Sequence, residues 1–236
     1  MPHATGIEPL YCRLEAFRLF HDQLTELHTT TGLVRAVAAV SMHALDDVTI
    51  EQIEHDIQSL AQRVIDRCPS GQPAARLAHL HDVLFDEDRF VGNLDNYYLA
   101  LNSYLPAVLR THRGLPILLA LLYKAVGEQV GLTIEGINSP GHFLARVQTE
   151  EGWLIVDPFY NGQALSVVEA FRRIELVAGR KIPRNELYLT PATHAQWLAR
   201  IIGNLQALFG KERRQYDLGA MTELQQILAE HTATGV

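Results

Sequence analysis

The sequence predicts an α+β protein that is mostly helical, and three observations support this fold class. Apolar residues recur at helical spacing through the first half of the chain. Residues 117–130 are apolar on nearly every face, which predicts a helix buried on most sides. Short apolar segments of β type follow around Pro140-Gly141, and helical spacing returns after Asp157-Pro158. We therefore expect a buried helix packed on a small antiparallel sheet, with further helices before and after it.

The N-terminal region predicts several helices in succession. Thr49, followed three residues later by Gln52, is typical of a capping box at a helix start. A further helix is expected over residues 74–85, and the acidic and glycine-containing residues 86–95 predict a loop. The apolar stripes that indicate the first three helices are Leu14, Phe17, Leu24 and Leu27, then Leu33, Val34, Val37, Val40 and Leu45, then Ile53, Ile57, Leu60 and Val64.

The central region predicts a short helix over residues 102–109 and a break at residues 112–115. Pro116 then stands in the first turn of the buried helix, where a missing N–H costs nothing. Gly131 is a suitable residue to end that helix. Further helices are expected over residues 167–177, 193–209 and 221–231, with Pro183 and Pro191 in the gaps between them.

Two strands, residues 142–147 and 153–157, predict a β-hairpin that carries His142 and Asp157. If Gln148 pairs with either Glu151 or Trp153, both side chains lie on one face, roughly 5 to 8 Å apart at Cβ. A carboxylate at that distance can hold one imidazole nitrogen and fix the tautomer. The other interpretation is local: Asp157 ends the strand through Asp-Pro turn chemistry, and His142 follows a glycine turn.

Composition limits the classes of function. The net charge of −7 with neutral histidines and the pI near 5.9 argue against a broad nucleic-acid surface, so no nucleic-acid partner is expected. We find no signal-peptide pattern and no apolar run long enough to span a bilayer, so a cytoplasmic protein with no membrane association is expected. The two cysteines, Cys12 and Cys68, exclude a disulfide framework and a four-cysteine zinc site. No metal and no cofactor is predicted.

The order of these elements resembles the transglutaminase-like cysteine-peptidase fold, and the detailed motifs resemble its SirB-type bacterial branch. The resemblance covers about residues 33 to 210. The motifs that carry it are Asn96-Tyr97-Tyr98, Asn102-Ser103-Tyr104-Leu105, Val108-Leu109, Arg113-Gly114-Leu115-Pro116-Ile117, Leu122-Tyr123, Pro140-Gly141-His142-Phe143-Leu144 and Val156-Asp157-Pro158-Phe159.

The resemblance implies a role for each position of a catalytic triad. In the superfamily a cysteine at the helix N-terminus is the nucleophile, a strand histidine is its base, and an aspartate orients the histidine. His142 and Asp157 match the last two positions, as the remnant of a triad, but the nucleophile position falls on Pro116. Proline has no ionisable side chain, so chemistry through a thiolate is not expected at this site.

The resemblance also suggests an organisation of the chain in three parts. These are an N-terminal helical region over residues 1–92, a transglutaminase-like core over residues 93–190, and C-terminal helices over residues 191–236. SirB-type proteins continue into tetratricopeptide-like helices after a segment that resembles residues 199–205. Here the tail has room for one or two helices and no array, which makes docking of a partner through such repeats doubtful.

Other polar residues near the hairpin are weaker candidates. Asn102, Arg113 and Ser139 are candidate pocket residues; Arg113 could equally satisfy carbonyl groups at a helix end. Ser139 and Ser103 are hydroxyls that His142 could in principle activate, although Ser103 is better explained as a helix cap.

Three functional hypotheses follow, in this order. The first is a non-catalytic protein with a binding, regulatory or scaffold role, whose cleft at His142 and Asp157 binds a peptide, protein or small molecule. The second is a hydrolase or acyltransferase in which His142 is the general base for a non-cysteine nucleophile or for water. The third is a helical interaction module with a purely structural hairpin. The sequence specifies neither the ligand nor an oligomeric state.

Overall fold

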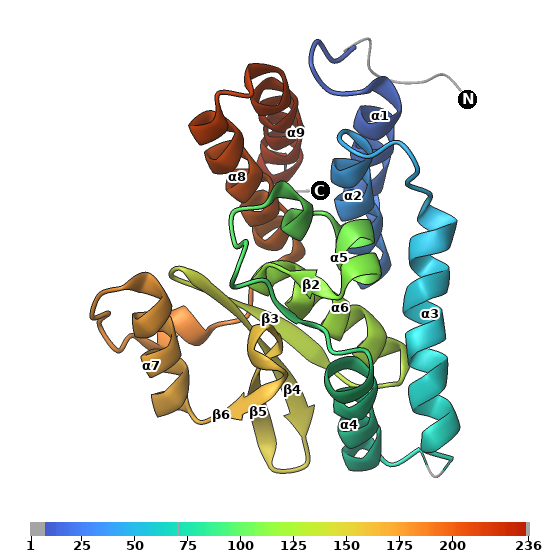
Figure 1. Cartoon of the computed structure of the whole chain (residues 1–236), viewed down its shortest axis with the longest axis vertical. Helices are drawn as coiled ribbons and strands as arrows, with labels where there is room; N and C mark the ends of the chain where they lie inside the picture. The colour runs from blue at the N-terminus through green and yellow to red at the C-terminus, as the bar shows by residue number, and fades with distance from the viewer. Residues whose placement is uncertain (1–7, 70, 235–236) are drawn as a thin grey trace.

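The computed structural model describes residues 8–69 and 71–234 and has the α+β, mostly helical architecture that the sequence predicts (Figure 1). Four helices come first, and one turn of π-helix, Asp82–Glu87, continues the last of them. These helices are α1 (Leu14–Gln23), α2 (Thr30–Met42), α3 (Ile50–Arg67) and α4 (Pro73–His81). Thr49 caps α3 by accepting the Gln52 N–H at 3.3 Å, but Gln52 donates to Asp56, so only half of the expected capping box forms.

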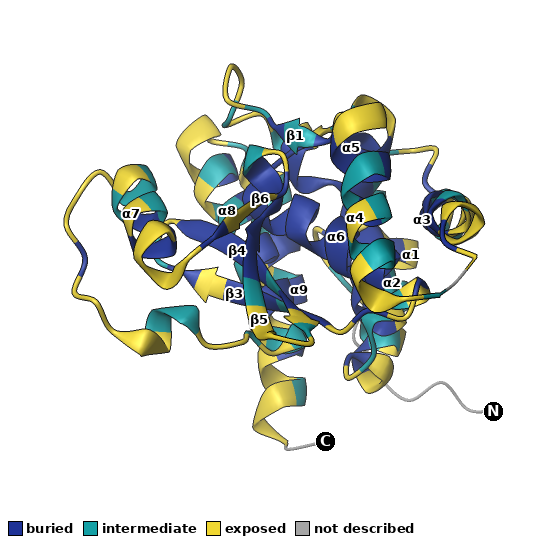
Figure 2. Cartoon of the chain, turned by 90° about the horizontal axis from the view of Figure 1, so that it is seen from below, coloured by how far each residue is buried: buried dark blue, intermediate teal, exposed yellow. Residues whose placement is uncertain are grey.

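The centre of the protein is helix α6 (Pro116–Gln129), which α5 (Leu105–Thr111) precedes. Every residue of α6 from Pro116 to Gly127 is buried, as the apolar pattern predicts. Figure 2 shows α6 as a dark blue element between the sheet and the helices α2 to α4. Lys124 is the charged residue in this buried stretch: its Nζ donates to the Ile134 carbonyl at 2.6 Å and pairs with Glu128. Because α6 is buried in this way, it holds the groups at its N-terminus in fixed positions.

A four-stranded antiparallel sheet packs against α6 in the order β3-β4-β5-β6. The strands are β3 (Ile134–Ser139), β4 (His142–Thr149), β5 (Gly152–Asp157) and β6 (Gln163–Leu165). Pro140-Gly141 makes the turn from β3 to β4, and Gly141 has a φ of 73°, a conformation that favours glycine. Two short segments, β1 (Val91–Gly92) and β2 (Arg113–Gly114), pair in parallel outside this sheet. The sequence patterns indicated β4 and β5 but not β3, β6 or the β1 and β2 pair.

Three more helices follow the sheet, α7 (Val167–Ala178), α8 (His194–Glu212) and α9 (Gln215–Ala233). α9 begins six residues before the expected start because Arg213, with a φ of 59°, ends α8 in a left-handed conformation and α9 restarts at once. Figure 1 shows α8 and α9 side by side above the sheet, while α7 lies beyond its β6 edge.

Trp197 of α8 joins the C-terminal helices to the core. Its side chain is fully buried, its ring lies 4.6 Å from that of Phe143, and its Nε1 donates to the Ile117 carbonyl at 3.2 Å. The indole fills the space above Gly136, where a Cβ would lie 2.2 Å from the ring. One side chain therefore contacts α6, β3 and β4 together.

Candidate functional site

His142 and Asp157 stand on adjacent strands and are hydrogen bonded. Gln148 pairs with Trp153 and Ala145 with Val156, which is the second of the two registers expected and makes His142 and Asp157 diagonal neighbours. The Nε2 atom of His142 lies 3.0 Å from Oδ2 of Asp157, and both side chains are fully buried. The hairpin thus brings the two predicted site residues together.

Asp157 has two further partners, so both interpretations of this residue hold at once. Its Oδ1 accepts the Phe159 N–H at 3.1 Å, which is the Asp-Pro turn chemistry at the start of a short 3-10 helix. Its Oδ2 also accepts from Arg173 of α7 at 2.5 Å. The Arg173 guanidinium lies 3.8 Å from the centroid of the Tyr160 ring. Arg173 compensates the buried carboxylate, and sequence reasoning missed it.

The partners of Asp157 determine which nitrogen of His142 carries a proton. The carboxylate only accepts hydrogen bonds, so Nε2 of His142 must donate. In the neutral imidazole Nδ1 is then the acceptor. Among the described residues Nδ1 is buried and has no hydrogen-bond partner. A buried polar atom without a partner is rare in a folded protein, and one beside a cavity is a candidate contact for a ligand.

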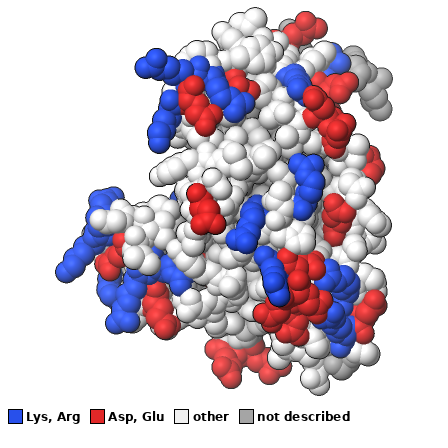
Figure 3. Space-filling model, viewed as in Figure 1, with Lys and Arg blue, Asp and Glu red and all other residues white. Residues whose placement is uncertain are grey.

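A cavity of about 350 Å³ borders His142. The lining includes His142 but not Asp157, which holds Nε2 of the ring. Figure 3 shows the surface recessed between the α8 and α7 ends of the molecule, and α8 supplies Arg200, Asn204, Ala207, Leu208 and Lys211 to the cavity lining. It is lined by Tyr97, Tyr98, Leu99, Ser103, Leu115, Pro116, Ile117, Gly141, His142, Phe143, Arg200, Asn204, Ala207, Leu208 and Lys211.

Pro116 is a buried part of the cavity wall at the first position of α6. The resemblance assigns the nucleophile to this position, and the proline side chain offers no group that could attack a substrate. A larger hollow of about 710 Å³ lies elsewhere, along α6, α8 and the segment 24–30, but it does not border His142. Its buried Lys124 is already paired with Glu128, so we regard the smaller cavity as the candidate site.

Comparison with known families accounts for this arrangement. A family model described as the transglutaminase-like superfamily matches residues 51–203, which include α6, the whole sheet and Trp197. The chain belongs to the transglutaminase-like superfamily. The expectation drawn from the buried helix and the hairpin is therefore confirmed at the level of the superfamily.

Relatives of this transglutaminase-like chain occur in bacteria and in mammals. A UPF0162 protein of Xylella fastidiosa is 34% identical over 142 residues, covering 59% of this chain and 50% of the relative. F-box only protein 21 of Mus musculus is 35% identical over 143 residues, covering 55% of this chain and 21% of the relative. The chain thus spans about half the length of the UPF0162 protein and a fifth of the F-box protein. No solved structure matches the chain.

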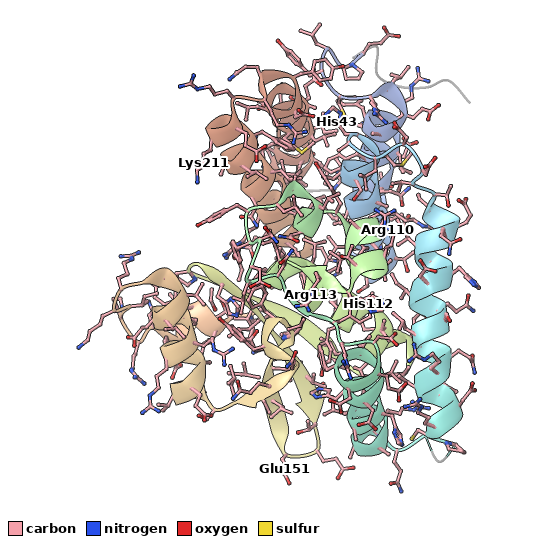
Figure 4. All side chains as sticks on the ribbon, viewed as in Figure 1. His43, Arg110, His112, Arg113, Glu151 and Lys211 are labelled. Atoms are coloured by element: carbon pink, nitrogen blue, oxygen red, sulfur yellow. The ribbon has the colours of Figure 1, made fainter. Side chains whose placement is uncertain are left out.

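The expectation that Asn102, Arg113 and Ser139 line the cleft of this superfamily member is not met, because none of them contributes to the cavity wall. Asn102 is buried and donates to the carbonyls of Asn96 and Tyr97, so it organises the loop before it. Figure 4 shows Arg113 beside His112, far from Lys211. The Ser139 hydroxyl donates to the Tyr188 carbonyl at 2.8 Å. The polar groups of Asn102 and Ser139 are hydrogen bonded elsewhere, and Arg113 is exposed.

Ser103, expected to be a helix cap, is a cavity residue. Tyr104 occupies the N-cap position of α5, and no side chain caps that helix. Ser103 is buried, lines the cavity, and among the described residues its hydroxyl has no hydrogen-bond partner. The Leu115 N–H donates to the Asn102 carbonyl at 3.0 Å, which fixes Ser103 beside the N-terminus of α6.

The two cysteines lie away from the cavity. Both are buried, Cys12 before α1 and Cys68 at the C-terminal end of α3. Burial, with a smaller contribution from the Glu223 charge, raises the pKa of the Cys12 thiol to about 12. Over residues 8–69 and 71–234, no group of three His, Cys, Asp or Glu side chains is arranged to hold a metal ion, and no helix is long and apolar enough to cross a membrane.

Proposed function

We propose that this chain is a non-catalytic member of the transglutaminase-like superfamily that binds a ligand in the cavity beside His142. The observation that carries the proposal is the combination of Pro116 in the wall and the unpartnered Nδ1 of His142 at the same cavity. The cavity offers space and polar atoms that can contact a ligand, but the residue at the N-terminus of α6 is Pro116 and has no thiol. If the hairpin had only a structural role, no cavity beside His142 would be expected.

The absence of thiol chemistry can be tested by labelling. Neither cysteine of the native protein is expected to react quickly with a thiol reagent such as Ellman's reagent, because both thiols are buried and that of Cys12 is neutral near pH 7. In concentrated urea both should react at the rate of an exposed cysteine. The measurement is the absorbance of the released thiolate over time, with amine incorporation into casein recorded in parallel. Rapid native labelling together with amine incorporation would contradict the proposal.

A second candidate function is acyl hydrolysis with Ser103 as the nucleophile. It is favoured by one observation: the Ser103 hydroxyl has no partner among the described residues and borders the cavity that His142 borders. In this reaction Ser103 Oγ would attack a carbonyl carbon and His142 Nδ1 would take the hydroxyl proton. His142 would then give that proton to the leaving group, and water would release the acyl group by the same steps.

The two candidates predict different results with p-nitrophenyl esters. The binding proposal predicts that the wild-type protein, Ser103→Ala and His142→Ala all hydrolyse the ester at the rate of a denatured sample. Hydrolysis by Ser103 predicts a wild-type rate above that background and a loss of at least about 100-fold in both variants. Ser139→Ala is the matched control, since this serine lies nearby but outside the cavity.

A further inference from the structure

The lining of the cavity beside His142 is positively charged, although the protein as a whole is negatively charged. The chain carries a net charge of −7, yet the described residues that line the cavity include two cations, Arg200 and Lys211, and no aspartate or glutamate. Neither cation forms an ion pair with any described residue. By contrast, the Arg63 and Arg173 guanidinium groups elsewhere are neutralised by carboxylates.

Arg200 is held in place without a counter-charge. Its guanidinium donates to the Ser139 carbonyl at 2.6 Å and to the Asn138 side chain, and it lies 5.9 Å from the centroid of the Phe143 ring. These neutral partners orient the group and leave its charge uncompensated. Burial lowers the pKa of Arg200, which indicates an electrostatic cost that a bound anion would relieve.

Lys211 and the start of α6 extend the positive character of the cavity. The Lys211 ammonium lies 4.8 Å from the centroid of the Tyr98 ring, and Figure 4 shows the side chain projecting from the end of α8. Pro116 and Ile117 are the first two residues of α6, so the positive end of a 14-residue helix forms part of the wall. His142 Nδ1, buried and without a partner, is the independent sign that a polar group of a ligand belongs here.

Apart from Ser103, Asn204 and the tyrosine hydroxyls, the rest of the lining is apolar and defines the body of the ligand. Its apolar side chains are Leu99, Leu115, Pro116, Ile117, Phe143, Ala207 and Leu208, with the ring of Tyr97 beside them. A volume of about 350 Å³ is near the lower end of the range of about 300–1,000 Å³ that is typical of small-molecule sites. The cavity therefore has room for one compact apolar group and a charged end, but not for an extended polyanion.

We propose that the ligand is a carboxylate with a compact apolar body, whose charged end contacts Lys211, while Arg200 adds to the positive potential of the cavity. The inference rests on the proposed function, since it specifies what the cavity binds. The Lys211 ammonium favours a carboxylate through a charge-assisted hydrogen bond. The same chemistry is offered by a free carboxylic acid and by the C-terminal residue of a peptide, and the experiment distinguishes these two sources.

The test uses matched acid and amide probes on the full chain. N-acetyl-phenylalanine and N-acetyl-phenylalaninamide differ only in the charged end, and binding is followed by ¹H–¹⁵N NMR shifts of residues around the cavity. We expect the acid to bind at least about 10-fold more tightly than the amide, because only the acid can form a charge-assisted hydrogen bond to a cation of the cavity. The tripeptide N-acetyl-Ala-Ala-Phe then identifies the source: tighter binding than the single residue indicates a chain end, and equal or weaker binding a free acid.

Two charge-reversal variants provide the control. Lys211→Glu should weaken binding of the acid at least about fivefold and leave binding of the amide unchanged. Lys181→Glu makes the same change at an exposed lysine outside the cavity and should leave both affinities within about twofold, since solvent screens a distant charge. If both variants behave alike, Lys211 does not contact the ligand and the inference is overturned.

The outcomes separate this inference from the proposed function. If acid and amide bind in the cavity with equal affinity, the cavity is a binding site but the carboxylate inference is wrong. If neither probe binds at millimolar concentration, or both bind only outside the cavity, the carboxylate inference fails and the proposed binding site loses its support as well. Only preferential binding of the acid, lost in Lys211→Glu, supports both.

Discussion

Replacing Asp157 with alanine is expected to lower the free energy of unfolding by about 3–5 kcal/mol, because it leaves buried charged and polar partners without compensation. The carboxylate has no solvent exposure and accepts hydrogen bonds from His142, Arg173 and the Phe159 N–H. Arg173 is only 13% exposed, so water can solvate its charge poorly once the carboxylate is gone. The measurement is urea unfolding followed by circular dichroism.

Two control variants show whether the loss comes from the uncompensated charge. Glu151→Ala removes a carboxylate at the exposed hairpin tip and should change the free energy of unfolding by less than about 0.5 kcal/mol. Arg173→Met in the Asp157→Ala background should recover part of the loss, since it removes the buried cation and keeps the bulk of the side chain. A loss below about 1 kcal/mol in Asp157→Ala would mean that the network contributes little to stability.

The second large effect is expected for Trp197→Ala. The indole is fully buried, packs on Phe143, and donates to the Ile117 carbonyl, so its removal leaves a cavity among three elements and loses that hydrogen bond. Loss of a large buried aromatic side chain costs about 3–5 kcal/mol of unfolding free energy. Urea unfolding measures the change, with the fluorescence of the remaining tryptophan as a second signal.

Trp153 is the matched control, because the chain has two tryptophans and this one is 42% exposed on the hairpin. It contacts Arg146, whose guanidinium lies 4.3 Å from the ring centroid, and such a contact at an exposed site is worth about 0.5–1 kcal/mol. Trp153→Ala should therefore cost no more than about 1 kcal/mol. Similar losses in the two variants would contradict the role assigned to Trp197.

The parts of the fold that the sequence predicts are those whose signal is local. Helical spacing identified α1 to α3 and α6 because each buries one stripe, or every face, against the core. The sequence left two hairpin registers open, and both place His142 and Asp157 on one face; the structure has the register that pairs Gln148 with Trp153. Pairing of the three-residue strand β6 and of the two-residue β1 and β2 depends on distant partners, and segments this short have no period of their own.

The candidate-site residues that the sequence did not predict lie on α7 and α8, which follow the sheet in the sequence. Arg173 reaches Asp157 only because α7 packs at the edge of the sheet, and Arg200 and Lys211 reach the cavity only because α8 crosses it. Spacing within a helix does not specify which neighbour its polar face meets. A buried carboxylate does require a cation, so the tandem Arg172-Arg173 was a usable signal for Asp157.

The cavity walls come from segments 97–117, 141–143 and 200–211, which meet only when α8 is docked on the core. A ligand that fits the cavity would therefore bind the folded chain and not the unfolded one, and it would couple occupancy to the attachment of the C-terminal helices. At a free concentration 100 times the Kd, such a ligand adds about 2.7 kcal/mol to the free energy of unfolding. Thermal-shift screening of compound collections can then recognise the natural ligand of this protein without any assay of catalysis.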